Sequence, residues 1–149
     1  PAKFCSDSVP MKNVYKHLAE SVQCDHVVYL HVTSPLLEIS TLNSCISKYK
    51  ELDNSYSSLA TVEHLMKYIW FKNKAINYDP KNHPRSQDLE KSFHDAGQFY
   101  WGKRSAWMKE ERILDQNTVP VYIPRYKVQD IDDEEDWIQA ERIFNKLRY

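Results

Sequence analysis

One uninterrupted apolar run constrains the fold of this chain more than any other feature. Residues 26–32, His-Val-Val-Tyr-Leu-His-Val, are mainly β-branched and aromatic, too continuous for a strand with one face in water. The run predicts a central strand of a mostly parallel sheet, covered by helices on both faces. Thr33, Ser34 and Pro35 follow; proline ends strand pairing, and the two hydroxyls offer adaptable hydrogen-bonding groups. Because ligands of open α/β sheets bind at the carboxyl ends of strands, we expect a binding site here.

The composition indicates one ordinary globular domain over residues 1–149. Of its 149 residues 42% are hydrophobic and 28% are charged, and no stretch is long and apolar enough to span a membrane. A net charge of -1 gives no electrostatic reason for binding nucleic acid or an anionic membrane. Cys5, Cys24 and Cys45 lack CxxC spacing, which argues against a disulfide framework or a zinc site and favours the cytoplasm.

Two further features suggest that the chain is part of a longer protein. It begins at Pro1 with neither an initiator Met nor a signal-like segment, and its only glycines are Gly97 and Gly102. Loops that cradle phosphates with backbone N–H groups are normally rich in glycine. We therefore expect a truncation at the amino terminus, with any phosphate loop lying in the missing part.

Periodicity predicts the other elements around the first strand. Helices are expected from Ser8–Pro10 to Val22, after a cap at Ser40–Thr41, over 103–111, and from Asp133. The last of these helices is expected to complete the core. Strands are expected at 59–62, 98–101 (short), 119–123 (an edge strand) and around Tyr126 and Val128. The alternation of helices and strands favours a Rossmann-type α/β sheet.

Residues 64–93 read as an arm inserted into this domain. Two aromatic runs, 68–71 and 75–78, flank Lys72-Asn73-Lys74, which is a plausible hairpin turn. An isolated hairpin is marginal in water, so its aromatic side chains need cover from a partner subunit or from the same chain. We expect a partner subunit.

Asp130 and Asp132 are the strongest candidates for chemistry. Residues two apart on an extended backbone point the same way, so the two carboxylates converge while Ile131 points into the core. Such a pair at a strand end suits Mg²⁺, which takes one or two protein oxygens plus water and phosphate oxygens. The alternative is that one of them only caps the final helix.

Two other polar groups are less specific. Arg85-Ser-Gln-Asp88 could grip a carboxylate through the arginine, or could be a solvated turn. His94-Asp95 resembles part of a catalytic dyad, but no serine or cysteine in a nucleophile elbow accompanies it, which argues against a hydrolase.

Four motifs in order resemble the acylneuraminate cytidylyltransferases, the family that makes CMP-activated sialic-type sugars. They are Leu30-His-Val-Thr-Ser-Pro-Leu36, Arg85-Ser-Gln-Asp-Leu89, Gly97-Gln-Phe-Tyr100 and Asp130-Ile-Asp132. The resemblance covers essentially the whole chain. The amino-acid sequence of residues 94–102 and 128–132 is most similar to that of the pseudaminic acid branch.

The resemblance implies a three-layer, glycosyltransferase-A-like nucleotidyltransferase fold, with an arm that builds a homodimer and reaches the neighbour's active site. It implies CMP transfer from CTP to a nine-carbon 2-keto sugar acid, with release of pyrophosphate. Asp130 and Asp132 would hold Mg²⁺, while Gln87 and Tyr100 would line the sugar pocket beside Thr33 and Ser34.

The chain also departs from the family pattern. His31 stands where many relatives have Gln, at a position expected to touch the sugar. Ser86 stands where relatives often have Arg, with Arg85 one residue earlier, so the group that grips the sugar carboxylate stays open. A non-catalytic dimerising or sugar-binding remnant of the same fold is the alternative function. We expect the chain by itself to fold but not to turn over CTP.

Overall fold

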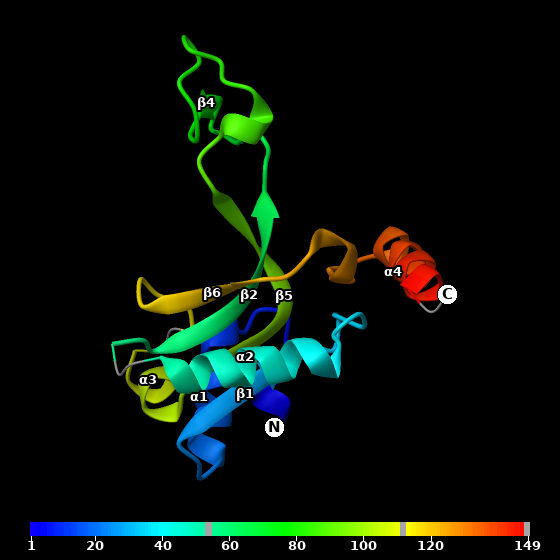
Figure 1. The fold of residues 1–149 in the computed structure, drawn as a ribbon. Helices are drawn as coiled ribbons and strands as arrows, with labels where there is room; N and C mark the ends of the chain where they lie inside the picture. The colour runs from blue at the N-terminus through cyan, green and yellow to red at the C-terminus, as the bar shows by residue number, and fades with distance from the viewer. Residues whose placement is uncertain (53–54, 111–112, 148–149) are drawn as a thin grey trace.

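The structure is a computed structural model and describes residues 1–52, 55–110 and 113–147. At its centre is a four-stranded sheet with the order β1-β5-β2-β6 (Figure 1). In that order the strands are His26–Leu30, Ser92–Lys103, Ser58–Leu65 and Thr118–Tyr122. Strand β5 runs antiparallel to β1 and β2, whereas β6 is parallel to β2. The carboxyl ends of β1, β2 and β6 therefore point the same way.

Helices cover both faces of the sheet, as predicted. On one face, α1 (Met11–Ser21) and α3 (Arg104–Glu110) contribute Tyr15, Ala19 and Trp107 to a core with Tyr100 of β5. On the other face, α2 (Ile39–Glu51) contributes Cys45 and Tyr49 to a second core with Leu59 and Phe99. Because successive strand residues face opposite ways, Phe99 and Tyr100 belong to different cores. The three-layer arrangement is confirmed.

The prediction that residues 26–32 form the central strand of a mostly parallel sheet is wrong for the described residues. Strand β1 is at the edge and pairs with β5 alone, and two of the three strand pairings are antiparallel. Val28 and Leu30 are 37% and 47% exposed. An apolar run shows that a strand is hydrophobic, but it does not show which strand pairs with it or whether that pairing is parallel. The segment predicted as a short strand at 98–101 is part of β5, which has 12 residues and lies inside the sheet.

The predicted helices are present, but their serine caps are not. Before α1, the Ser8 hydroxyl hydrogen-bonds that of Ser6 at 2.8 Å, and Pro10 precedes the helix without a side-chain cap. Ser40 lies inside the first turn of α2, where its hydroxyl donates to Glu38 Oε2 at 3.0 Å, and Glu38 precedes the helix without a side-chain cap. Tertiary packing of the apolar faces therefore fixes these two helices more than capping does.

The chain after β6 departs from the prediction at one point. The predicted edge strand is β6, but the strand expected around Tyr126 and Val128 is a 3₁₀ turn, Arg125–Lys127. Pro124 lacks an N–H and its carbonyl accepts the Lys127 N–H at 2.8 Å, which closes a turn rather than a sheet ladder. The turn brings the chain back toward β5.

Helix α4 (Glu134–Leu147) begins where predicted but does not complete the core. Figure 1 shows it to the side of the sheet, beyond the end of β6. Ala140 of this helix is buried, whereas Trp137, Phe144 and Leu147 are exposed. The core of the described residues therefore forms between the sheet and α1, α2 and α3. No helix in the described ranges is long and apolar enough to cross a membrane.

The arm projects from the sheet between the end of β2 and the start of β5, residues 66–91 (Figure 1). Its hairpin consists of β3 (Trp70–Phe71) and β4 (Lys74–Ala75), and Lys72 and Asn73 have φ of 47° and 60°. Two consecutive left-handed residues form the turn that suits a tight hairpin, so the predicted turn is confirmed. Trp70 and Phe71 remain 60% and 61% exposed. Dimerisation through the arm stays a prediction.

A bulge interrupts the pairing of β5 with β2 between Asp95 and Tyr100. Ala60 of β2 pairs with Tyr100, yet Val62 pairs with Asp95, so more residues of β5 than of β2 occupy this interval. Within it Gly97 has φ of +59°, and a Cβ placed there would lie 2.8 Å from Asp130 Oδ2. Both the backbone conformation and the close approach require glycine.

We expect Gly97→Ala to destabilise the fold by roughly 1–3 kcal/mol, because alanine is strained at positive φ and its Cβ would displace Asp130. Thermal unfolding followed by circular dichroism measures the effect. Ser92→Ala, at the start of the same strand, is the control and should unfold close to the wild-type temperature. Equal unfolding temperatures for wild type and Gly97→Ala would show that the bulge relaxes without cost.

Candidate functional site

A polar cavity of about 560 Å³ lies beside the bulge. Its lining comes from the end of β1, from β2 and β5, from the segment after β6 and from α4. The charged residues among the described lining are five acids and one arginine: Glu63, Asp95, Asp130, Asp132, Asp136 and Arg125. This excess of carboxylates favours a cation at the site.

Asp130 and Asp132 both line this cavity, whereas Ile131 lines a separate apolar groove of about 210 Å³ on the other side. The shared side predicted from their spacing is thus present. Asp130 Oδ1 is buried and has no hydrogen-bond partner among the described residues. The α4 cap is a different residue, since Asp133 Oδ1 accepts the Asp136 N–H at 3.0 Å. Neither Asp130 nor Asp132 caps the helix.

The donor chemistry of this pair fits Mg²⁺. A buried carboxylate oxygen without a partner is costly unless a ligand or ion satisfies it. In the described part of the chain, no group of three His, Cys, Asp or Glu residues is arranged to hold a metal. Mg²⁺ requires fewer protein ligands than that, because water and substrate phosphate commonly complete its coordination.

The loop after β1 supports the aspartate segment. The Thr33 carbonyl accepts the Ile131 N–H at 2.9 Å, and the buried Ser34 hydroxyl donates to the Gly97 carbonyl at 2.6 Å. Neither Thr33 nor Ser34 is among the described residues that line the cavity. In this structure both residues connect the loop to the site, while their predicted contact with sugar stays a prediction.

His31 and Tyr100 do line the cavity, side by side. The His31 ring meets Tyr100 edge-on at 4.8 Å and Tyr29 at 5.1 Å between centroids. Its Nε2 is buried without a hydrogen-bond partner in the described part of the chain. A fixed ring with one unsatisfied nitrogen can hydrogen-bond a ligand.

Asp95 is a cavity residue that sequence reasoning missed, because it was weighed only as half of a hydrolase dyad. Its Oδ2 accepts the Tyr100 hydroxyl at 2.5 Å, and its Oδ1 accepts the Gly97 N–H at 3.0 Å. Burial, and then the bond to Asp95, raises the pKa of Tyr100 well above its usual value. The tyrosine therefore stays protonated. The Nδ1 atom of the neighbouring His94 lies 3.6 Å from Glu63 Oε1.

Arg85 and Gln87 are not brought to this cavity by their own chain. They lie on the arm, where Arg85 Nε and Nη2 contact the Asp88 carboxylate at 2.7 and 3.0 Å and the arginine side chain is 72% exposed. Arg125 is the arginine that lines the cavity instead. Sequence reasoning missed Arg125, because the segment around it was assigned to a strand.

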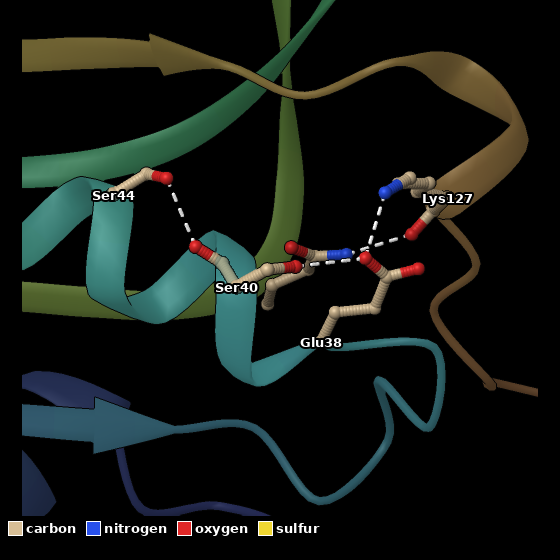
Figure 2. Close-up of polar contacts among 5 residues, drawn as sticks. Glu38, Ser40, Ser44 and Lys127 are labelled. Atoms are coloured by element: carbon tan, nitrogen blue, oxygen red, sulfur yellow. Dashed lines mark hydrogen bonds and ion pairs between the residues drawn. The ribbon is translucent and has the colours of Figure 1, made fainter.

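An ion pair joins the two loops that carry the site. Figure 2 shows Lys127 reaching Glu38, which also receives the Ser40 hydroxyl. The Lys127 Nζ to Glu38 Oε2 distance is 2.7 Å. The buried Gln98 side chain donates to the Lys127 carbonyl at 2.7 Å and ties the same turn to β5. The segment leading to Asp130 is thus held from two sides.

This ion pair predicts a pH-dependent contribution to stability. The hydrogen bond from Lys127 lowers the pKa of Glu38, and the hydrogen bond to Glu38 raises the pKa of Lys127. A carboxyl with a lowered folded pKa stabilises above its unfolded pKa, and that stabilisation is lost as pH falls through the folded pKa. The lysine contribution is present below its unfolded pKa and is lost as pH rises through the raised value.

We therefore expect Lys127→Met to unfold at a lower temperature than wild type between about pH 5 and pH 9, with a small effect because the pair is partly exposed. The difference should disappear as pH falls through the lowered pKa of Glu38 and the carboxyl becomes protonated. Lys91→Met replaces another exposed lysine and serves as control. A pH-independent difference would mean that the lysine stem, and not the ion pair, stabilises the turn.

Known proteins that are similar to this chain bear on its fold and on its relatives. No protein-family model matches the chain. It is 31% identical over 152 residues to a pseudaminic acid cytidylyltransferase in each of two strains of Campylobacter jejuni subsp. jejuni, covering 98% of this chain and 65% of each relative. The chain therefore spans just under two thirds of their length. A Helicobacter pylori protein, pseudaminic acid cytidylyltransferase and UDP-2,4-diacetamido-2,4,6-trideoxy-beta-L-altropyranose hydrolase, is 40% identical over 47 residues, 32% of this chain and 9% of that protein.

Among solved structures, CMP:2-keto-3-deoxy-manno-octonic acid synthetase complexed with CTP has a TM-score of 0.60. The match covers 94% of this chain and 70% of that one at 11% sequence identity, so it bears on the fold alone. The predicted nucleotidyltransferase fold is confirmed. The chain is homologous to curated pseudaminic acid cytidylyltransferases along nearly its whole length, which confirms the resemblance inferred from the motifs.

Proposed function

We propose that the protein carrying this chain transfers CMP from CTP to a nine-carbon 2-keto sugar acid of the pseudaminic acid type, and releases pyrophosphate. The observation that carries the proposal is the unsatisfied Asp130 carboxylate beside Asp132 in a polar cavity. This site lies in a chain homologous over 98% of its length to pseudaminic acid cytidylyltransferases. CTP and the sugar acid are the proposed substrates, with no nucleic acid or membrane partner.

In this proposal the sugar's anomeric hydroxyl attacks the α-phosphorus of CTP. A new O–P bond forms, and the bond to the leaving pyrophosphate breaks. Asp130 and Asp132 would hold Mg²⁺, which when bound neutralises charge on the phosphates. The chain's own contribution is positioning, since phosphoryl transfer needs little covalent help from protein. Asp130 is fixed against Gly97, and Asp132 is fixed because its N–H donates to Asp136 at 3.1 Å.

His31 and Tyr100 would contact the sugar, and Thr33 and Ser34 would hold the loop beside it. We place the reaction in the cytoplasm, where nucleoside triphosphates are made and thiols stay reduced. The free thiols of Cys5, Cys24 and Cys45 are compatible with that location.

Arg85 and Gln87 are proposed to act in a neighbour's cavity within a homodimer. Their side chains lie on the arm and outside the cavity of their own chain, and the arm ends in the exposed Trp70 and Phe71. Aromatic side chains exposed together on a projecting hairpin are typical of a surface that a partner covers. A second subunit would then supply an arginine to a cavity that has only Arg125 among its described lining residues.

In the full-length protein that carries this chain, we expect Asp130→Asn and Asp132→Asn each to lower the rate of pyrophosphate release roughly 100-fold or more, because stabilising the charge of a transferring phosphoryl group usually contributes most of the catalysis. The assay contains CTP, Mg²⁺ and pseudaminic acid. Asp25→Asn, between α1 and β1, removes one carboxylate outside the cavity and should leave the rate unchanged. Near-normal rates in both cavity mutants would exclude the aspartates as metal ligands.

The same assay separates the enzyme from a non-catalytic module of this fold. Binding of CTP or of the sugar acid in calorimetric titration, without pyrophosphate release by the wild-type protein, would favour the module. Release that requires both substrates and Mg²⁺ would support the enzyme.

Subunit complementation tests the shared site. Arg85→Ala and Asp130→Asn proteins should each be nearly inactive, whereas co-expressed subunits should recover activity. A mixed dimer has one cavity with Asp130 from one chain and Arg85 from the other. If the arm serves its own cavity, every cavity of the mixture carries a defect and no activity returns. Asp132→Asn with Asp130→Asn is the matched negative pair, because both lesions fall on the same side of the site.

A further inference from the structure

The direction of one hydrogen bond determines what the sugar side of the cavity can recognise. Tyr100 donates its only hydroxyl hydrogen to Asp95 Oδ2 at 2.5 Å. A phenol has one donor hydrogen, so the same oxygen can then only accept hydrogen bonds from a ligand. An ionised aspartate is likewise an acceptor only. The Tyr100–Asp95 pair therefore offers a ligand hydrogen-bond acceptors and no donors.

The surrounding contacts prevent the pair from changing roles. Tyr100 is 9% exposed, and its ring packs edge-on against His31 at 4.8 Å and Tyr15 at 6.3 Å, which restricts its rotation. The second oxygen of Asp95 is occupied by the Gly97 N–H at 3.0 Å. Both members of the pair are thus held in one arrangement before any ligand arrives.

The charge on neighbouring residues reinforces the preference. Glu63 and Asp130 line the same cavity as Tyr100 and Asp95, and both carry a carboxyl group. A sugar carboxylate placed against this pair would meet acceptors and negative charge, because neither Tyr100 nor Asp95 has a hydrogen to donate to it. An N–H or O–H group placed here would find a fixed partner.

We propose that Asp95 is a positioning residue that fixes the Tyr100 hydroxyl as a hydrogen-bond acceptor, so that this part of the cavity binds an N–H or O–H group of the sugar acid and turns its carboxylate away. The inference rests on the proposed function and deepens it. A site built to hydrogen-bond one kind of group discriminates strongly, because a mismatched ligand leaves buried polar groups unpaired.

The test compares Asp95→Ala, Tyr100→Phe and the double mutant. Each single mutant should raise the KM for pseudaminic acid roughly tenfold, the size expected for one lost hydrogen bond in a desolvated site. The KM for CTP should stay within about twofold, since the pair faces the sugar and not the nucleotide. The double mutant should match the single mutants, because the aspartate acts only through the tyrosine. Asp25→Asn is the control for loss of an acidic side chain.

A purely structural role predicts a different pattern. Asp95 also holds the Gly97 N–H, so its loss could loosen the bulge and with it Asp130. In that case Asp95→Ala would impair CTP and sugar alike, and its effect would add to that of Tyr100→Phe. Either result would overturn the inference.

Calorimetric titration of pseudaminic acid keeps this inference separate from the proposed reaction. If the wild-type protein binds the sugar but releases no pyrophosphate, the reaction fails, and the inference still predicts roughly tenfold weaker binding by both single mutants. Equal affinities would overturn the inference while leaving an observed reaction intact. No binding of the sugar by wild type would overturn both.

Discussion

The candidate site depends on the close approach of the Asp130 carboxylate to the backbone of Gly97. No side chain fits between them, since a Cβ at Gly97 would lie 2.8 Å from Asp130 Oδ2. The approach is possible only because the regular hydrogen-bonded pairing of β5 is interrupted at the bulge. The same bulge leaves the Gly97 N–H and carbonyl free of strand pairing, and Asp95 and Ser34 bind them. One irregular interval of a strand thus connects the aspartate segment, the loop after β1 and the Tyr100 pair.

Some polar atoms around this interval have hydrogen-bond partners, and others have none among the described residues. Gln98 is buried and fixes Lys127 through its amide N–H, and its backbone carbonyl accepts the His31 N–H at 3.0 Å. Asp130 Oδ1, His31 Nε2 and Gln98 Oε1 are nevertheless buried without partners among the described residues. Asp130 and His31 line the cavity, whereas Gln98 does not. A buried polar atom without a hydrogen-bond partner destabilises the fold, and a bound ligand commonly supplies the missing partner.

Short spacings in the sequence predicted local features, whereas features that depend on distant partners were missed. Helical periodicity located α1, α2 and α3, and the two-residue spacing of Asp130 and Asp132 predicted their shared side. The apolar run could not encode the strand directions or the edge position of β1. Residues five apart on a regular strand face opposite sides of the sheet, so nothing in the sequence pairs Asp95 with Tyr100. The bulge shifts that alternation and brings the carboxylate within 2.5 Å of the tyrosine hydroxyl. Residues 94–97 interrupt the apolar pattern of β5 and line the cavity, so the interruption was itself the signal of the site.

The charge balance of the cavity links the proposed reaction to the proposed dimer. Among the described lining residues five carboxylates face one arginine, yet both proposed substrates are anions. A cavity with this balance repels a triphosphate and a sugar acid unless cations accompany them. In the proposed reaction, Mg²⁺ brought with the nucleotide would offset part of that charge at Asp130 and Asp132. The sugar carboxylate still needs a cationic partner away from Tyr100 and Asp95. In the proposed dimer, Arg85 of a neighbouring arm would supply this partner, and its planar guanidinium contacts the Asp88 carboxylate through two nitrogens in the same way. The acidity of the cavity would then be a physical reason for the arm to reach a second chain.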